Sequence, residues 1–209
     1  MKTAKMNNVV DNEGKLDLVL ASSSPRRKEL LTRMGFQFEV YKVEFDETVE
    51  PHWKTVDVAR KLSEGKNYAC RKKLLLPIII TADTVVMKDG NILGKPRDKE
   101  EALQMLSNLS DCTHEVITGV TISSEVKMVS FSDTTEVKFA KLEQEELEYY
   151  VDQFSPMDKA GSYGIQEWIG IVGVEYLKGS FYNVMGLPTH RIYRVLTQDF
   201  NLSAVFAHK

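Results

Sequence analysis

The chain has 209 residues, of which 43% are hydrophobic and 27% are charged, and its formal net charge is -3. A chain of this size can bury a sizeable core, so we expect one globular domain that is able to form two lobes. The negative balance argues against a general nucleic-acid or membrane-surface binder, whose affinity would come from a basic excess. Any polyanionic ligand must then be met by local clusters of cations.

The N-terminal segment and the cysteines indicate the compartment. Residues 1–15 are polar and lack the apolar core of a secretory signal, and we expect them to form a disordered arm before a single domain at residues 16–209. No apolar stretch approaches the roughly 18 residues of a membrane span. Cys70 and Cys112 do not have the spacing of a disulfide scaffold or a zinc site. A reducing cytoplasm is therefore the expected location.

The hexapeptide Ser-Ser-Ser-Pro-Arg-Arg at residues 22–27 follows an apolar run that predicts a buried strand at residues 16–21. Ser24 is a typical N-cap, and the proline after it suits the first position of a helix that ends at Gly35. The helix N-terminus, the Ser22 and Ser24 hydroxyls and two guanidiniums would converge, which favours a polyphosphate site. The alternative is an N-capped surface helix with two solvated arginines.

An acidic loop and a long helix come next. Residues 36–43 predict a second strand, and the acidic loop at residues 44–50 contains Glu47. Most such charge runs are solvated, but a carboxylate here could also hold a divalent metal that bridges phosphates. Residues 55–73 show the pattern of an amphipathic helix with a glycine that weakens its middle. A lysine on this helix, such as Lys66, is expected to be solvated.

Residues 77–87 are the most apolar run of the chain and predict a central strand, which Asp83 and Thr84 interrupt. A carboxylate in a core strand is costly unless it is paired, so Asp83 is either hydrogen-bonded structure or faces a polar cleft, and we favour the cleft. A hairpin turn then leads to Gly94-Lys95-Pro96. This is not a P-loop, because the preceding glycine is one residue too close and proline replaces the Ser or Thr.

The rest of the chain mixes helical and strand patterns around a polar, glycine-rich loop at residues 158–166. Such loops often carry function because a rigid scaffold holds them. Asp98 and Glu101 are expected to cap the first helix of this part. The elements are expected in this order: a helix ending at residue 108, antiparallel strands at 114–123 and 127–139, a helix at 143–154, strands at 169–174 and 180–184, and a helix at 189–196.

Five motifs in this order resemble the Maf family of nucleotide pyrophosphatases. They are the hexapeptide at residues 22–27, Ala82-Asp83-Thr84-Val85-Val86, Gly94-Lys95-Pro96, the loop at residues 158–166 and Gly186-Leu187-Pro188. Their order over nearly the whole chain is far more specific than any one motif. The resemblance implies an elongated α/β fold like that of the inosine triphosphate pyrophosphatases, with a strongly bent mixed sheet, helices and a cleft between two lobes.

The resemblance also implies an activity. Maf proteins hydrolyse a nucleoside triphosphate between the α and β phosphates, with a divalent cation such as Mg²⁺ or Mn²⁺, and they are commonly homodimers. By position, Asp83 matches the family's proton acceptor beside the metal, and Glu47 matches an acidic position near the metal. The cations that match residues around the phosphates are Arg27, Lys66 and Lys95.

Three further positions bear on the choice of base. Arg26, Thr84 and Gln166 match the members that act on dTTP and UTP rather than on 7-methyl-GTP. One departure is visible, because Glu167-Trp168 follows Gln166 where the family pattern has glycine. This bulkier pair could reshape the base pocket.

The residue types also fit this chemistry without reference to the family. A triphosphate carries roughly four negative charges, and its hydrolysis needs charge cancellation and alignment more than covalent help. Asp83, next to cations, can orient and deprotonate a water molecule. The main alternative is a non-catalytic nucleotide-sensing or septum-inhibiting interaction protein, but it leaves Asp83 without a role. Neither a nucleic-acid polymer nor a membrane is an expected partner.

Overall fold

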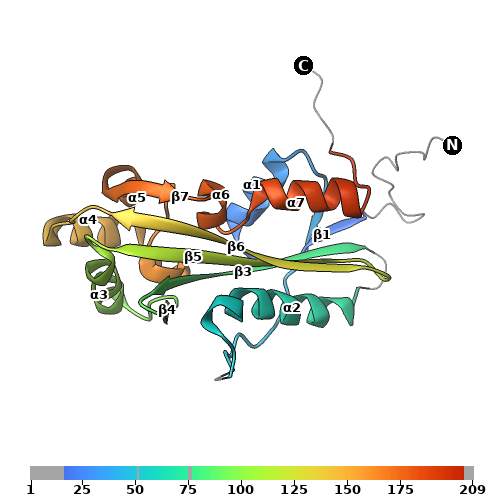
Figure 1. Cartoon of the computed structure of the whole chain (residues 1–209), viewed down its shortest axis with the longest axis horizontal. Helices are drawn as coiled ribbons and strands as arrows, with labels where there is room; N and C mark the ends of the chain where they lie inside the picture. The colour runs from blue at the N-terminus through green and yellow to red at the C-terminus, as the bar shows by residue number, and fades with distance from the viewer. Residues whose placement is uncertain (1–16, 51, 75–76, 205–209) are drawn as a thin grey trace, which may run out of the picture.

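The structure is a computed structural model that describes residues 17–50, 52–74 and 77–204. The arm expected at residues 1–15 lies outside the described residues. Figure 1 shows an elongated molecule in which three long strands run side by side through its length, β3 (Ile78–Lys88), β5 (Thr113–Ser123) and β6 (Met128–Phe139). These strands confirm the expected central strand and the antiparallel pair that follows it.

The sheet is mixed, as expected for the fold class. Its strand order is β2-β1-β3-β5-β6-β7, and β4 pairs with β3 off this path. β1 is parallel to β2 and β3, whereas the other pairings are antiparallel. The shorter strands are β1 (Leu18–Leu20), β2 (Glu39–Val40), β4 (Asn91–Leu93) and β7 (Val174–Lys178).

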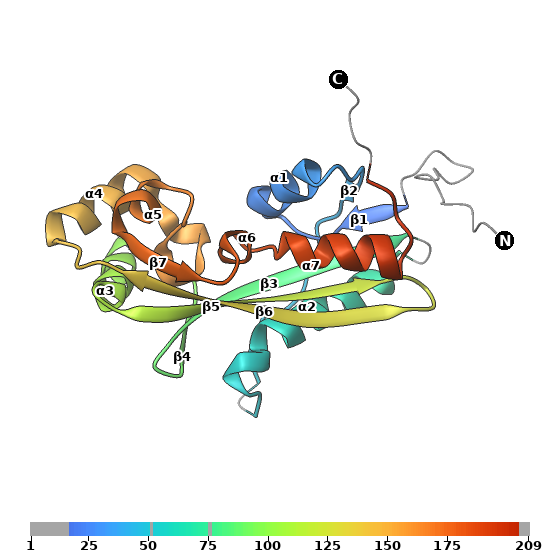
Figure 2. The same ribbon diagram turned by 45° about the horizontal axis from the view of Figure 1, so that its top comes forward.

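Helices cover both faces of the sheet. The helices are α1 (Pro25–Arg33), α2 (Val58–Arg71), α3 (Lys99–Leu109), α4 (Gln144–Phe154), α5 (Trp168–Gly173), α6 (Phe181–Val184) and α7 (Thr189–Arg194). α2 lies on one face, while α1, α6 and α7 lie on the other (Figures 1 and 2). α3, α4, α5 and β7 gather at one end of the long strands and form a second lobe. No helix in the described part of the chain is long and apolar enough to cross a bilayer.

The middle of β3 has no neighbouring strand on one of its edges, and this gap determines where its polar residues are accessible. On one edge, β3 pairs with β1 through residues 78–80 and with β4 through residues 86–88, so residues 81–85 have no strand beside them among the described residues. On the other edge, β5 pairs with β3 continuously from Ile79 to Met87. The polar residues of β3 therefore lie at an open edge, with the rest of the sheet holding them rigidly.

Two glycines allow α2 to approach its neighbours closely. Gly119 of β5 lies opposite Asp83, and a Cβ atom added to it would lie 2.2 Å from the main-chain carbon of Ala59 in α2. A Cβ atom at Gly65, the glycine expected to weaken the helix, would lie 2.3 Å from the ring of Phe45. The glycine that lowers helix propensity is thus the residue that lets the acidic loop pack on α2.

Three predicted strands differ from the structure. Of residues 36–43, only the two-residue β2 is a strand, and both of its residues are exposed. Residues 169–173 form helix α5, so the predicted strand at 169–174 is wrong, and the strand begins at Val174 instead. The predicted strand at 180–184 is also wrong, because residues 181–184 form α6.

The misassigned segments are short apolar runs, which periodicity cannot separate into helix and strand. Ser180 caps α6, since its Oγ accepts a hydrogen bond from the Asn183 amide at 3.3 Å. In α5, Ile169 is buried while Ile171 is 78% exposed, so the run is not a buried strand. Tertiary contacts therefore decided between helix and strand at these positions.

Candidate active site

A cavity of about 630 Å³ opens where the two lobes meet at the free edge of β3. The sequence motifs converge on it from segments far apart in the chain. Its lining includes every residue that the sequence nominated: Ser22, Ser24, Arg26, Arg27, Glu47, Lys66, Asp83, Thr84, Lys95 and Gln166. The prediction that Asp83 faces a polar cleft is therefore confirmed. The alternative for residues 22–27, a surface helix with two solvated arginines, is wrong.

The N-terminus of α1 begins as predicted. Ser24 is the N-cap, and its Oγ accepts a hydrogen bond from the Arg27 amide at 3.4 Å, while Pro25 occupies the first turn. The Ser22 Oγ accepts from the Ser24 amide at 3.2 Å. The helix start thus points its positive end and two hydroxyls at the cavity.

Arg27 connects three segments of the cavity wall. Its guanidinium donates to the Gly186 carbonyl at 2.8 Å, to the Ala82 carbonyl at 2.8 Å and to the Thr84 hydroxyl at 3.1 Å. The Ala82 carbonyl is available because β3 has no neighbouring strand there. Burial lowers the pKa of Arg27, and the charge of Asp83 opposes this effect. Arg27 therefore holds the wall together as well as placing a cation in it.

Asp83 and Glu47 meet at one ammonium group. The Lys66 Nζ forms an ion pair with Asp83 Oδ2 and lies 2.6 Å from Glu47 Oε1, while the Thr84 amide donates to Asp83 Oδ1 at 2.8 Å. Lys66 is only 9% exposed, so the expectation of a solvated helix lysine is wrong. Its place on α2 turns it toward the open edge of β3, where two carboxylates compensate its burial.

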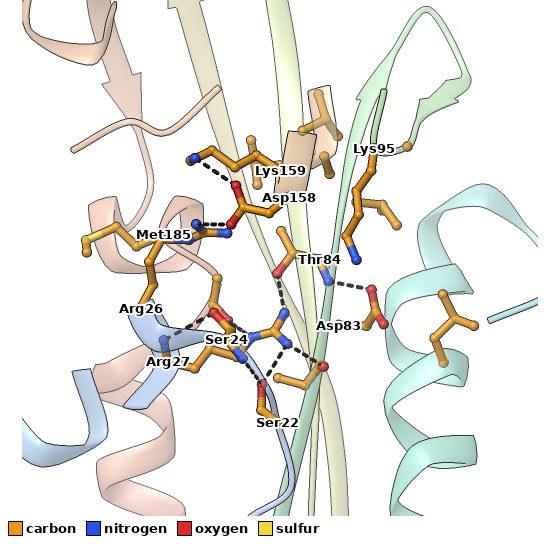
Figure 3. A pocket seen from close by; sticks show the side chains of 18 of the residues that line it. Ser22, Ser24, Arg26, Arg27, Asp83, Thr84, Lys95, Asp158, Lys159 and Met185 are labelled. Carbon is orange, nitrogen blue, oxygen red and sulfur yellow. Dashed lines mark hydrogen bonds and ion pairs between the residues drawn. The ribbon is translucent and has the colours of Figure 1, made fainter. Parts of the chain in front are cut away.

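The acidic loop residue Glu47 is charged despite its partial burial. Burial raises the pKa of its carboxyl, but the hydrogen bond and charge of Lys66, followed by the charges of Lys95 and Arg27, outweigh burial and lower the pKa overall. Lys95 follows β4, is exposed, and points toward Asp83 in Figure 3. Among the described residues, Lys95 has no hydrogen bond or ion pair, so its ammonium is available to an anion in the cavity.

The three residues matched to base selection line the same cavity and differ in their contacts. Arg26 forms an ion pair with Asp158 at 2.9 Å, and the Thr84 hydroxyl contacts the Thr118 hydroxyl at 2.9 Å. The Gln166 Oε1 is buried and has no hydrogen-bond partner in the described part of the structure. An unpaired buried acceptor that lines a cavity is suited to a donor supplied by a ligand.

Sequence reasoning missed the residues that hold the glycine-rich loop. The Lys159 Nζ lies 2.8 Å from Asp158 and 3.2 Å from Glu167, and the Tyr150 hydroxyl donates to the other oxygen of Glu167. Of the residues described, those lining the cavity include Gln166 but neither Glu167 nor Trp168. Glu167 therefore does not line the base pocket itself, and its carboxylate is held in the second lobe by Tyr150 and Lys159.

A buried histidine supports the same wall. The His114 Nε2 lies 2.7 Å from the hydroxyl of Tyr163, a residue of the cavity lining whose ring packs edge-on against Phe139. Burial lowers the pKa of His114 to about 4, so the imidazole is neutral at pH 7. This contact holds the buried Tyr163, a residue of the cavity lining, in place from behind.

Relatives of the chain are known, and they match nearly all of it. The dTTP/UTP pyrophosphatase of Phocaeicola vulgatus is 46% identical over 190 residues, which cover 90% of this chain and 98% of the relative. The dTTP/UTP pyrophosphatase of Porphyromonas gingivalis is 46% identical over 203 residues, 93% of this chain and all of the relative. That of Cytophaga hutchinsonii is 43% identical over 185 residues, 88% and 85% of the two chains.

The family assignment follows from the match of the sequence, and the geometry of the cavity agrees with it. The five sequence motifs, separated by up to about 160 residues, line one cavity in the structure. Residues 17–199 match the family described as Maf-like protein. The chain therefore belongs to the Maf-like protein family.

Proposed function

We propose that this protein hydrolyses dTTP and UTP to their monophosphates and pyrophosphate. The observation that carries the proposal is the placement of the Asp83 carboxylate at the open edge of β3, in a cavity that also contains Arg27, Lys66 and Lys95. A carboxylate among cations can activate water, and the cations can stabilise the charge that develops on a triphosphate. The names of the relatives support the choice of substrate.

The triphosphate would lie between the start of α1 and Lys95. Ser22 and Ser24 offer hydroxyls, and the positive end of the helix dipole favours an anion. The Lys95 ammonium, which has no ion pair among the described residues, offers a charge. Arg27 uses most of its donors on the protein, so its main contribution would be a fixed positive charge. This arrangement needs little reorganisation when the substrate binds, which is the condition for effective electrostatic stabilisation.

Asp83 would orient the attacking water and take its proton. The Thr84 amide fixes one carboxylate oxygen at 2.8 Å, and Lys66 fixes the other. A carboxylate held on a strand between two such contacts keeps its direction, which proton transfer in a fixed geometry requires. Water attack on the α phosphorus then releases pyrophosphate as the leaving group.

Glu47 and Asp83 fit a divalent cation bound together with the substrate. Both carboxylates already converge on one cation, the Lys66 ammonium, and hard cations such as Mg²⁺ or Mn²⁺ take one or two protein carboxylates plus phosphate oxygens. Among the described residues, no group of three His, Cys, Asp or Glu side chains could hold a metal without such help. The metal would neutralise phosphate charge and align the reacting groups.

Arg26, Thr84 and Gln166 would read the base. Uracil and thymine offer acceptor, donor, acceptor along one edge, whereas cytosine offers donor, acceptor, acceptor. Gln166 can both donate and accept, whereas Arg26 only donates. UTP and dTTP should therefore be preferred over CTP, with weak discrimination between the two because the extra methyl is apolar.

Replacing Gln166 by Ala should lower kcat/KM for UTP more than for CTP. Each unmet buried group costs on the order of 1 to 3 kcal/mol, so the preference for UTP should fall about tenfold. The exposed Gln198 gives a matched control, and Gln198→Ala should leave both values unchanged. Equal losses for both nucleotides in Gln166→Ala would show that Gln166 positions the loop or the phosphates instead.

A screen of the nucleoside triphosphates for released pyrophosphate tests the proposal as a whole. We expect metal-dependent release that is fastest with dTTP and UTP. Binding of these nucleotides without turnover would instead support the nucleotide-sensing or septum-inhibiting alternative. That alternative gives no role to the Asp83 carboxylate.

We propose that the protein is located in the cytoplasm and acts as a homodimer. Both cysteines are free thiols, and burial raises the pKa of Cys70 to about 11, as expected of an inert thiol in a reducing compartment. Exposed apolar side chains near the outer strand β7, including Ile171 and Tyr176, support a self-association surface.

A further inference from the structure

Four side chains of alternating charge form a connected row from the second lobe across the cleft to α1. In order they are Glu167, Lys159, Asp158 and Arg26. The contacts along the row measure 3.2 Å between Glu167 and Lys159, 2.8 Å between Lys159 and Asp158, and 2.9 Å between Asp158 and Arg26. Figure 3 labels three of them, and its dashed lines join Lys159 to Asp158 and Asp158 to Arg26. The row therefore links Glu167 in the second lobe to Arg26 at the start of α1, and Arg26 is proposed to recognise the base.

The far end of the row is anchored in the second lobe. The Lys159 side chain is only 8% exposed and needs the carboxylates of Asp158 and Glu167 to compensate its buried charge. Glu167 in turn accepts a hydrogen bond from Tyr150 of α4, and the Tyr150 hydroxyl accepts one from the Gly164 amide at 3.0 Å. Lys159 is therefore held in place by the core of the lobe.

Asp158 joins this anchored lysine to a less restrained arginine. The two oxygens of Asp158 accept separately from Lys159 and from Arg26. Partial burial opposes ionisation of Asp158, but these two cations outweigh burial and hold its pKa below the ordinary value. Arg26 is 23% exposed, and Asp158 is its hydrogen-bonding partner across the cleft. The direction of the Arg26 guanidinium thus depends on a carboxylate from the opposite lobe.

We propose that Asp158 is a positioning residue for base recognition. Asp158 is held by the buried Lys159, and it fixes the Arg26 guanidinium in the orientation that recognises the base. The inference rests on the base-reading role proposed for Arg26. The same inference gives a role to Glu167, at which the chain departs from the family pattern. Glu167 restrains Lys159. Since the Arg26–Asp158 pair is partly exposed, its loss should change base preference by about fivefold, the upper range for such pairs.

A double-mutant cycle on nucleotide binding tests this proposal. The probes are the UTP and CTP analogues in which a methylene group replaces the oxygen between the α and β phosphates, so that neither can be cleaved at that bond. Calorimetry gives the ratio of their Kd values for the full-length protein and for Asp158→Asn, Arg26→Ala and the double variant. Asp158→Asn should lower the preference for the UTP analogue about fivefold. In the Arg26→Ala background the same change should have no further effect.

The control is Asp152→Asn, because Asp152 is similarly exposed and forms a 2.6 Å ion pair with Lys99 away from the cavity. It should leave the ratio unchanged. An unchanged ratio in Asp158→Asn, an equal loss in the Arg26→Ala background, or no base preference in the unmodified protein would each overturn the proposal. Pyrophosphate release by the unmodified protein is measured separately. Its absence together with the expected coupling would reject the hydrolytic function while leaving the positioning role intact.

Discussion

Asp83→Asn should lower kcat for dTTP and UTP by about a hundred- to ten-thousand-fold, the usual contribution of a general base. Asn keeps the size of Asp and an oxygen that can accept from the Thr84 amide, but it cannot take a proton from water. Lys66 retains its contact with Glu47 in the variant. The thermal midpoint should therefore change little while turnover collapses.

Steady-state kinetics and a thermal melt of the same preparation check this prediction. Asp111→Asn is a suitable control, since Asp111 is exposed and pairs with Lys138 outside the cavity. It should retain full turnover. If Asp83→Asn kept most of its turnover, Asp83 would be structural and the proposed mechanism would be wrong.

Gly119→Ala should produce the largest loss of stability. The added Cβ would lie 2.2 Å from the main-chain carbon of Ala59 and from the amide nitrogen of Arg60, so α2 itself must move. Overpacking against main chain costs about 3 kcal/mol. For a chain of this size, that corresponds to a fall in Tm of roughly 6 to 12 °C. Because α2 also carries Lys66, turnover should fall in the folded variant as well.

Gly94→Ala is the matched control for this experiment. A Cβ atom at Gly94 would meet nothing within 4 Å, and its backbone is not in the left-handed region. Its Tm should stay within about 2 °C of that of the unmodified protein. A similar Tm for both variants would show that the close approach of α2 to β5 is not a tight constraint.

The long elements of the fold could be predicted from the sequence because their local signals and tertiary roles agree. Residues 77–87 combine an apolar run with a hairpin turn, and Ser24 followed by proline marks the start of α1. The short apolar segments near residues 170 and 182 have no comparable signal. Ser180, an N-cap three residues before Asn183, was the one local sign that α6 is a helix.

The candidate site was predictable as a set of residues but not as a set of contacts. Motif order nominated Asp83, Lys95 and Gln166, and the fold brings all three to one cavity. The burial of Lys66 could not be predicted, because helical periodicity does not show which neighbours compensate a charge. The pairing of Asp158 with Arg26 joins residues 132 positions apart, and such contacts depend on how the two lobes meet.

The bond that is cleaved tests the central claim most directly. The protein should be incubated with dTTP and a divalent cation, and the products separated by anion-exchange chromatography. Attack on the α phosphorus, directed by Asp83 at the edge of β3, should give the monophosphate and pyrophosphate in equal amounts. The appearance of the diphosphate and orthophosphate instead would contradict the account, because the water would then attack the terminal phosphate.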